Sequence, residues 1–241
     1  MSSYKQRVQR AKEKQRERAL DLERRRKEAE MVNRERLGET GLTNEQKMLA
    51  KLSDIPYQRY TATKNKKLRD INPNLQLDSD LSNKHVSVIH DKSTGRTYIA
   101  HKGTQLTAEN IDDIDADVAI LTGNKHKHKR FLDAEKNYLD VKEKYGDNII
   151  LTGHSLGGAV SGHVARKHGA EAHLFNPGSS IGDVRGLNKN INKEKEERKG
   201  KIIHYKTDEI DPISILGIHG ADELVSIPQS ASNSHTLQNF I

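Results

Sequence analysis

The sequence contains no cysteine and no tryptophan, and only 4% of its 241 residues are aromatic. Without cysteine, disulfides and thiolate metal sites are excluded. No run of about 18 apolar residues occurs, so no membrane-spanning helix is expected. The first residues are polar and basic instead of apolar, so no secretory signal is expected either. We therefore expect a protein without disulfides that is soluble or peripherally bound.

Charge is distributed unevenly along the chain. Residues 1–40 hold 13 Lys and Arg against 8 Asp and Glu, which is +5 of the net charge of +7. Helix-forming residues dominate this stretch and apolar positions are sparse, so a basic helical or disordered arm is predicted. We place a domain boundary near Gly41 and expect a globular domain over residues 41–241.

The arm is expected to contact an anionic surface or a partner protein, and Arg24 to Lys27 is its densest basic cluster. It lacks the Trp, Phe and Leu face of a membrane-inserting helix. Nucleic acid is a weaker alternative, which predicts affinity that falls steeply with salt. The expected location is the cytoplasm or a larger assembly such as a virus particle.

Strands and helices are predicted to alternate after the arm. A capping box at Thr43–Gln46 predicts a helix from about residue 44, whereas residues 55–82 are polar and turn-rich and are expected to hold little regular structure. Strands are predicted at 85–90, 96–100, 149–151, 172–175, 202–205 and 223–227, and helices at 107–121, 126–145 and 156–168. This order predicts an α/β fold with a mostly parallel sheet flanked by helices.

One stretch has the pattern of a catalytic turn. Gly153-His154-Ser155-Leu156-Gly157 fits the G-x-S-x-G nucleophile elbow, with an apolar strand before it and a helix after it. The serine of such a turn needs small neighbours, which the two glycines supply. The helix points its free N–H groups at the serine, where they favour a developing negative charge.

A nucleophilic serine needs a base and a carboxylate that orients the base, and in α/β-hydrolases they follow in the order Ser, Asp, His. Asp211 comes shortly after a predicted strand, and Asp208 is its competitor on the same loop. His235 follows a loop long enough to reach the site and is preferred over His219.

Two backbone N–H donors are expected to form the oxyanion hole. Leu156 supplies one, and Thr104 supplies the other from the segment His101-Lys102-Gly103-Thr104. This chemistry requires no metal and no organic cofactor.

Four motifs together resemble class 3 lipases, the fungal triacylglycerol-lipase-like family of α/β-hydrolases. The elbow is one, and the others are the segments at 101–104, 211–214 and 234–237. The resemblance covers roughly residues 43–241 and implies a Ser155–Asp211–His235 triad that cleaves acylglycerol or phospholipid esters. His101 and Lys102 stand where the family has an aromatic residue and arginine, and no convincing apolar lid follows Thr104.

Two functions are therefore predicted. The first is a serine hydrolase that cleaves carboxylic esters, with an ester or lipid as its substrate. The alternative is a hydrolase-fold module with weak or no catalytic activity, which acts as a structural or assembly protein through its basic N-terminal arm.

Overall fold

A computed structural model describes residues 40–103, 129–178, 199–207, 221–231 and 235–241. The chain divides into two units, Met1–Thr43 and Asn44–Ile241, and the second is described below. The predicted arm and the helix expected over residues 107–121 lie outside the described residues.

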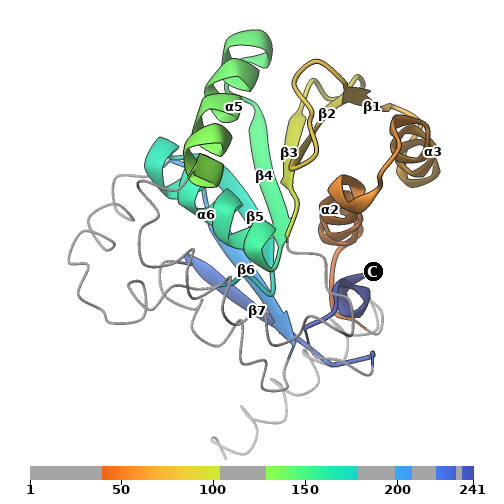
Figure 1. The fold of residues 1–241 in the computed structure, drawn as a ribbon. Helices are drawn as coiled ribbons and strands as arrows, with labels where there is room; N and C mark the ends of the chain where they lie inside the picture. Colours follow the sequence, from red (N-terminus) through yellow and green to blue (C-terminus); the bar gives the residue numbers. More distant parts are fainter. Residues whose placement is uncertain (1–39, 104–128, 179–198, 208–220, 232–234) are drawn as a thin grey trace, which may run out of the picture. The chain divides into compact units, whose positions relative to one another are not determined.

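The second unit is built on a seven-stranded sheet whose strands follow one another in chain order, β1 to β7 (Figure 1). β1, β2 and β3 pair antiparallel, and β3 to β7 pair parallel. The predicted α/β fold with a mostly parallel sheet is confirmed. The elements are α2 (Asn44–Asp54), η1 (Ile55–Tyr57), α3 (Thr61–Ile71), β1 (Leu75–Asp78), β2 (Val86–Asp91), β3 (Thr97–His101), α5 (Lys129–Tyr145), β4 (Ile149–His154), α6 (Leu156–His168), β5 (Glu171–Phe175), β6 (Ile202–Thr207), β7 (Glu223–Ile227) and η4 (Leu237–Phe240).

Helices cover both faces of the sheet around β4. Figure 1 shows α5 and α6 on one face and α2 on the other. Because successive residues of a strand point to opposite faces, Leu151 packs in the core beneath α5 and α6, whereas the Thr152 hydroxyl meets the Ser53 hydroxyl of α2 at 2.7 Å. β4 is therefore buried on both sides, and the elbow follows at its carboxyl end.

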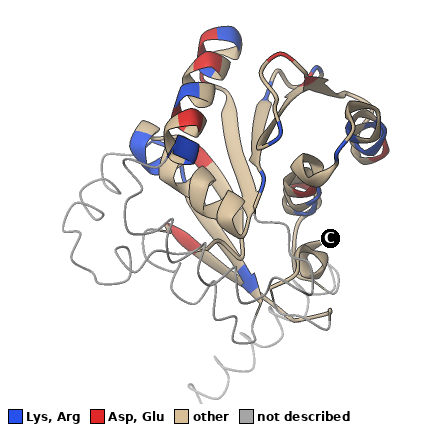
Figure 2. Ribbon diagram, in the orientation of Figure 1, with Lys and Arg blue, Asp and Glu red and all other residues tan. Residues whose placement is uncertain are grey.

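The core between the sheet and the two helices α5 and α6 is aliphatic with two aromatic side chains. Figure 2 shows Lys, Arg, Asp and Glu along α5, whereas α6 is charged only near its end. α6 is buried along ten successive residues from Leu156 to Ala165, which explains why small residues fill it. The buried members include Val88, Ile99, Phe131, Tyr138, Val141, Leu151, Val160, Val164 and Leu174.

The prediction of little regular structure over residues 55–82 is wrong, because η1, α3 and β1 lie there. α3 buries only Lys64 and Leu68. A helix with one buried apolar side chain has no hydrophobic periodicity to detect, so sequence patterning could not reveal it.

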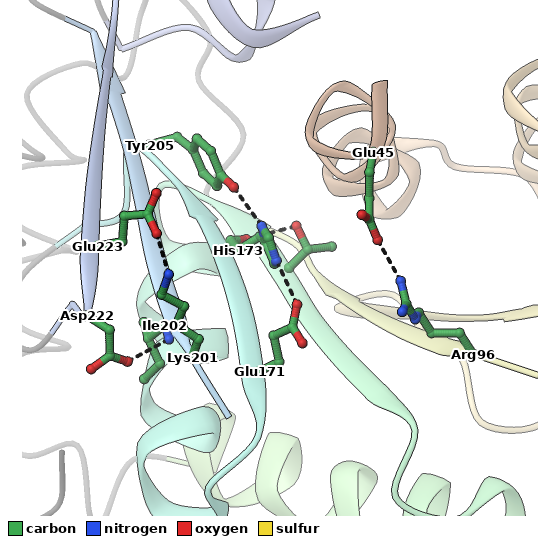
Figure 3. A network of polar contacts seen from close by, with 10 residues as sticks. Glu45, Arg96, Glu171, His173, Lys201, Ile202, Tyr205, Asp222 and Glu223 are labelled. Carbon is green, nitrogen blue, oxygen red and sulfur yellow. Dashed lines mark hydrogen bonds and ion pairs between the residues drawn. The ribbon is translucent and has the colours of Figure 1, made fainter. Parts of the chain in front are cut away.

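Polar contacts lie within β5, link β5 to β6, and link β6 to the residue before β7 (Figure 3). His173 Nε2 donates to Glu171 Oε1 at 3.0 Å, and its Nδ1 pairs with the Tyr205 hydroxyl of β6 at 2.7 Å. The backbone N–H of Ile202 donates to Asp222 Oδ2 at 2.8 Å. These histidine and carboxylate groups therefore stabilise the sheet.

Within the described part of the chain, no helix is long and apolar enough to cross a membrane.

Candidate active site

Ser155 occupies the sharp turn between β4 and α6, with φ 55° and ψ −127°. Such a conformation costs a residue other than glycine about 1–3 kcal/mol, so its surroundings must enforce it. The Ser155 N–H donates to the Phe175 carbonyl at 3.1 Å, and the Ser155 carbonyl accepts from the N–H groups of Ala159 (3.1 Å) and Gly178 (3.0 Å). Three backbone hydrogen bonds therefore hold the serine in the strained geometry of a nucleophile elbow.

Glycines let the backbone close tightly around this turn. A Cβ on Gly157 would collide with the His101 carbonyl oxygen and would lie 2.9 Å from Gly103 N. A Cβ on Gly153 would collide in turn with the backbone of Gly157. The end of β3 is therefore pressed against the first turn of α6, and no side chain fits between them.

The loop after β3 lies beside the serine. A Cβ on Gly103 would lie 2.7 Å from the His154 carbonyl oxygen and 3.4 Å from Ser155 Cβ. Leu156 is buried at the first position of α6, where backbone N–H groups have no acceptor within the helix. Thr104, the other predicted oxyanion donor, is outside the described residues, but the chain reaches it directly from Gly103.

Tyr57 is a site residue that sequence reasoning missed. Its hydroxyl accepts a hydrogen bond from Gly103 N–H at 3.0 Å, and the Lys102 ammonium lies 5.7 Å from the centre of its ring. The Arg130 guanidinium donates to the Lys102 carbonyl. Three contacts thus fix the backbone that leads to Thr104. Tyr57 and Gly103 are 46 residues apart, and no motif links them.

His235 lies beside the elbow. It is 4% exposed, its carbonyl accepts a 2.6 Å hydrogen bond from His154 Nε2, and the two rings are 4.9 Å apart. Since a carbonyl only accepts, His154 Nε2 carries a proton. His154 is directed at the His235 backbone, so it tethers the C-terminal segment to the residue before the serine.

The predicted residues are therefore brought together in part. Ser155 and Leu156 directly follow β4, and His235 contacts His154, the last residue of that strand. Asp211, its competitor Asp208 and the alternative base His219 lie outside the described residues.

His101 is excluded as a base at physiological pH. The Ser161 hydroxyl donates to the Thr152 carbonyl at 2.7 Å and accepts from His101 Nδ1 at 2.9 Å. Burial, helped by the charge of Arg130, lowers the pKa of His101 to about 3. His101 is a neutral residue that joins β3 to α6. Across the described ranges, no three His, Asp or Glu side chains are arranged to hold a metal ion.

We expect Tyr57→Phe to lower the free energy of unfolding by about 1 kcal/mol, because Gly103 N–H loses its acceptor. Burial raises the pKa of Tyr57 from 10.0 to about 12, against the opposing effect of the Gly103 hydrogen bond. Between these values the unfolded chain releases the phenolic proton and the folded protein keeps it. The stability that Tyr57 contributes is therefore complete below pH 10 and is lost as the pH rises toward 12.

Urea unfolding of both proteins at about pH 8 and about pH 11 measures this effect. The stability difference between wild type and Tyr57→Phe should narrow at the higher pH. Tyr60→Phe is the matched control, since Tyr60 is 64% exposed. An equal difference at both pH values would contradict the burial of the Tyr57 hydroxyl.

Comparison with known proteins defines the fold. Residues 99–222, just over half of the chain, match the Uncharacterised protein family (UPF0227). The comparison with curated protein sequences found no match. The solved Lip2 lipase from Yarrowia lipolytica is 21% identical over 77% of this chain and 78% of that one, with a TM-score of 0.50. This similarity shows a lipase-like α/β-hydrolase fold.

Two further structures have lower scores. A fungal lipase solved with an inhibitor is 17% identical over 70% of this chain and 72% of that one, with a TM-score of 0.47. A mutant form of MDLA from Penicillium cyclopium is 13% identical over 78% and 81% of the two chains, with a TM-score of 0.48.

Proposed function

This chain belongs to the Uncharacterised protein family (UPF0227), and we propose that it is a serine hydrolase that cleaves carboxylic esters. The observation that carries the proposal is Ser155 at a positive φ on a strand-to-helix turn, with His235 beside that turn. A strained serine is retained where its hydroxyl serves a reaction.

The proposed mechanism is acyl transfer through a covalent intermediate. Ser155 Oγ attacks the ester carbonyl while His235 takes the hydroxyl proton, and Asp211 orients the imidazole and stabilises its charged form. The N–H groups of Leu156 and Thr104 stabilise the oxyanion. His235 then gives the proton to the leaving alcohol, and water, activated by the same histidine, releases the acid.

The surroundings of the serine support these roles. The strain at Ser155 is maintained by backbone hydrogen bonds, so the nucleophile needs no rearrangement before attack. His154 holds the carbonyl of His235, which limits how far the base can move. Tyr57 holds Gly103 and thereby the start of the loop that contains Thr104. We propose lipid esters, acylglycerols or phospholipids, as the substrates, because the fold is that of lipases.

A fluorophosphonate probe tests this function directly, because it reacts with activated serines. We expect one label per chain on Ser155 by mass spectrometry, no label in Ser155→Ala, and slow labelling in His235→Ala. If the folded wild-type protein takes no label, the hydrolase proposal is wrong and the assembly module with a basic arm becomes the better account.

A further inference from the structure

A cationic pocket lies close to the candidate active site. This cavity of about 620 Å³ is lined by residues from η1 to α3, by β1 and the chain between β1 and β2, and by the residue that follows β3. Four of its lining residues are Arg59, Lys64, Lys84 and Lys102, and none of the described residues that line it is Asp or Glu. We refer to this cavity as the cationic pocket.

Lys64 is an unusual member of this lining because it is only 7% exposed. Its Nζ donates to the Ser87 hydroxyl at 3.0 Å, and no ion pair joins it to a carboxylate among the described residues. The Asp54 carboxylate is paired with Lys67 at 2.6 Å instead. A buried ammonium without a counter-ion is costly, so a bound anion would stabilise this pocket.

Burial and the positive charges around the pocket lower the pKa values of Lys64 and His85. Burial and then the charge of Lys102 lower the pKa of Lys64. Burial and the charges of Arg130, Lys84 and Lys102 lower the pKa of His85. An anion in the pocket would be attracted by several cations at once, within a partly desolvated space where such attraction is strong.

Tyr57 and Gly103 connect the pocket to Ser155. Tyr57 lines the pocket and binds Gly103 N–H, and a Cβ on Gly103 would lie 3.4 Å from Ser155 Cβ. We propose that the cationic pocket binds the phosphate group of an ester substrate whose acyl carbonyl lies at Ser155. The inference rests on the proposed hydrolase function and selects phosphate-bearing lipid esters as the substrate class.

The lining favours phosphate over an uncharged headgroup. Lysines act as point charges that pair with phosphate oxygens, and Ser82 and Asn83 are polar members of the lining. A neutral acylglycerol would fill the space and leave the Lys64 ammonium without a counter-ion, at a further cost in desolvation. The phosphate therefore supplies both recognition and orientation of the ester.

Calorimetric binding to full-length Ser155→Ala, which should not turn substrate over, tests the pocket separately from catalysis. The ligands are dihexanoyl phosphatidic acid, dihexanoylglycerol and inorganic phosphate, each below its aggregation limit. We expect the affinity for the phosphatidic acid to exceed that for dihexanoylglycerol by at least about tenfold. Adding Lys64→Gln or Lys84→Gln should reduce this preference about tenfold. Lys84 is exposed, so its variant should fold even if Lys64→Gln does not. Exposed Lys136 on α5 provides the control, Lys136→Gln.

Equal affinity for the charged and the neutral lipid, or a preference that survives both lysine substitutions, would overturn the assignment. Inorganic phosphate that binds as tightly as phosphatidic acid would indicate a site for free phosphate and would also overturn it. Selective binding by a protein that the fluorophosphonate does not label would refute the hydrolase and leave the pocket standing. Labelling of Ser155 without selective binding would refute the pocket alone.

Discussion

Ser155→Ala is expected to reduce kcat for hydrolysis of a short-chain aryl ester by about five orders of magnitude. The substitution removes the attacking oxygen, so no acyl-enzyme forms, and only binding and oxyanion stabilisation remain. Thermal unfolding should be almost unchanged, because alanine meets the same backbone strain at φ 55° and the backbone hydrogen bonds of residue 155 persist.

Ser226→Ala is the matched control, since Ser226 is exposed on β7. It should retain wild-type kcat and KM. Wild-type turnover in Ser155→Ala would remove Ser155 from the mechanism and with it the proposed triad.

Gly157→Ala is expected to destabilise the fold by about 3 kcal/mol or more. The new methyl group would collide with the His101 carbonyl oxygen and lie 2.8 Å from the carbonyl carbon and 2.9 Å from Gly103 N. All three atoms belong to the backbone, so no side-chain rotation relieves the contact. Either β3 separates from α6 or the elbow opens, and both displace the loop that leads to Thr104.

Gly162→Ala on the same helix separates this collision from the general effect of adding a methyl group. A Cβ there would lie 2.9 Å from Leu174 Cδ1, the flexible end of a side chain. Alanine also favours a helix by about 1 kcal/mol over glycine. We expect Gly162→Ala to unfold within about 1 kcal/mol of wild type in urea, using the linear extrapolation. Similar losses in both variants would show that β3 does not press on the start of α6.

The elements around the serine were predictable because their signals are local. The strand before Ser155 is an apolar run, and the helix after it ends at His168, with Gly169 at φ 68° as its left-handed C-cap. By contrast, α3 was missed because its buried face consists of Lys64 and Leu68. A lysine at a buried helix position reads as solvent-exposed in any hydrophobic pattern. The same lysine lines the cationic pocket.

Sequence alone determined the fold class and the strand-to-helix turn at Ser155, and it predicted His235 as the base, because each follows from residue type, spacing or chain order. Tertiary structure decided what surrounds them. It placed Tyr57 against Gly103, His154 against the carbonyl of His235, and four cations around one cavity. These contacts join residues that are far apart in the chain, and their geometry comes from sheet register and helix packing. A serine that can be recognised from five residues therefore acquires its neighbours, and its proposed preference for phosphate, only when the chain is folded.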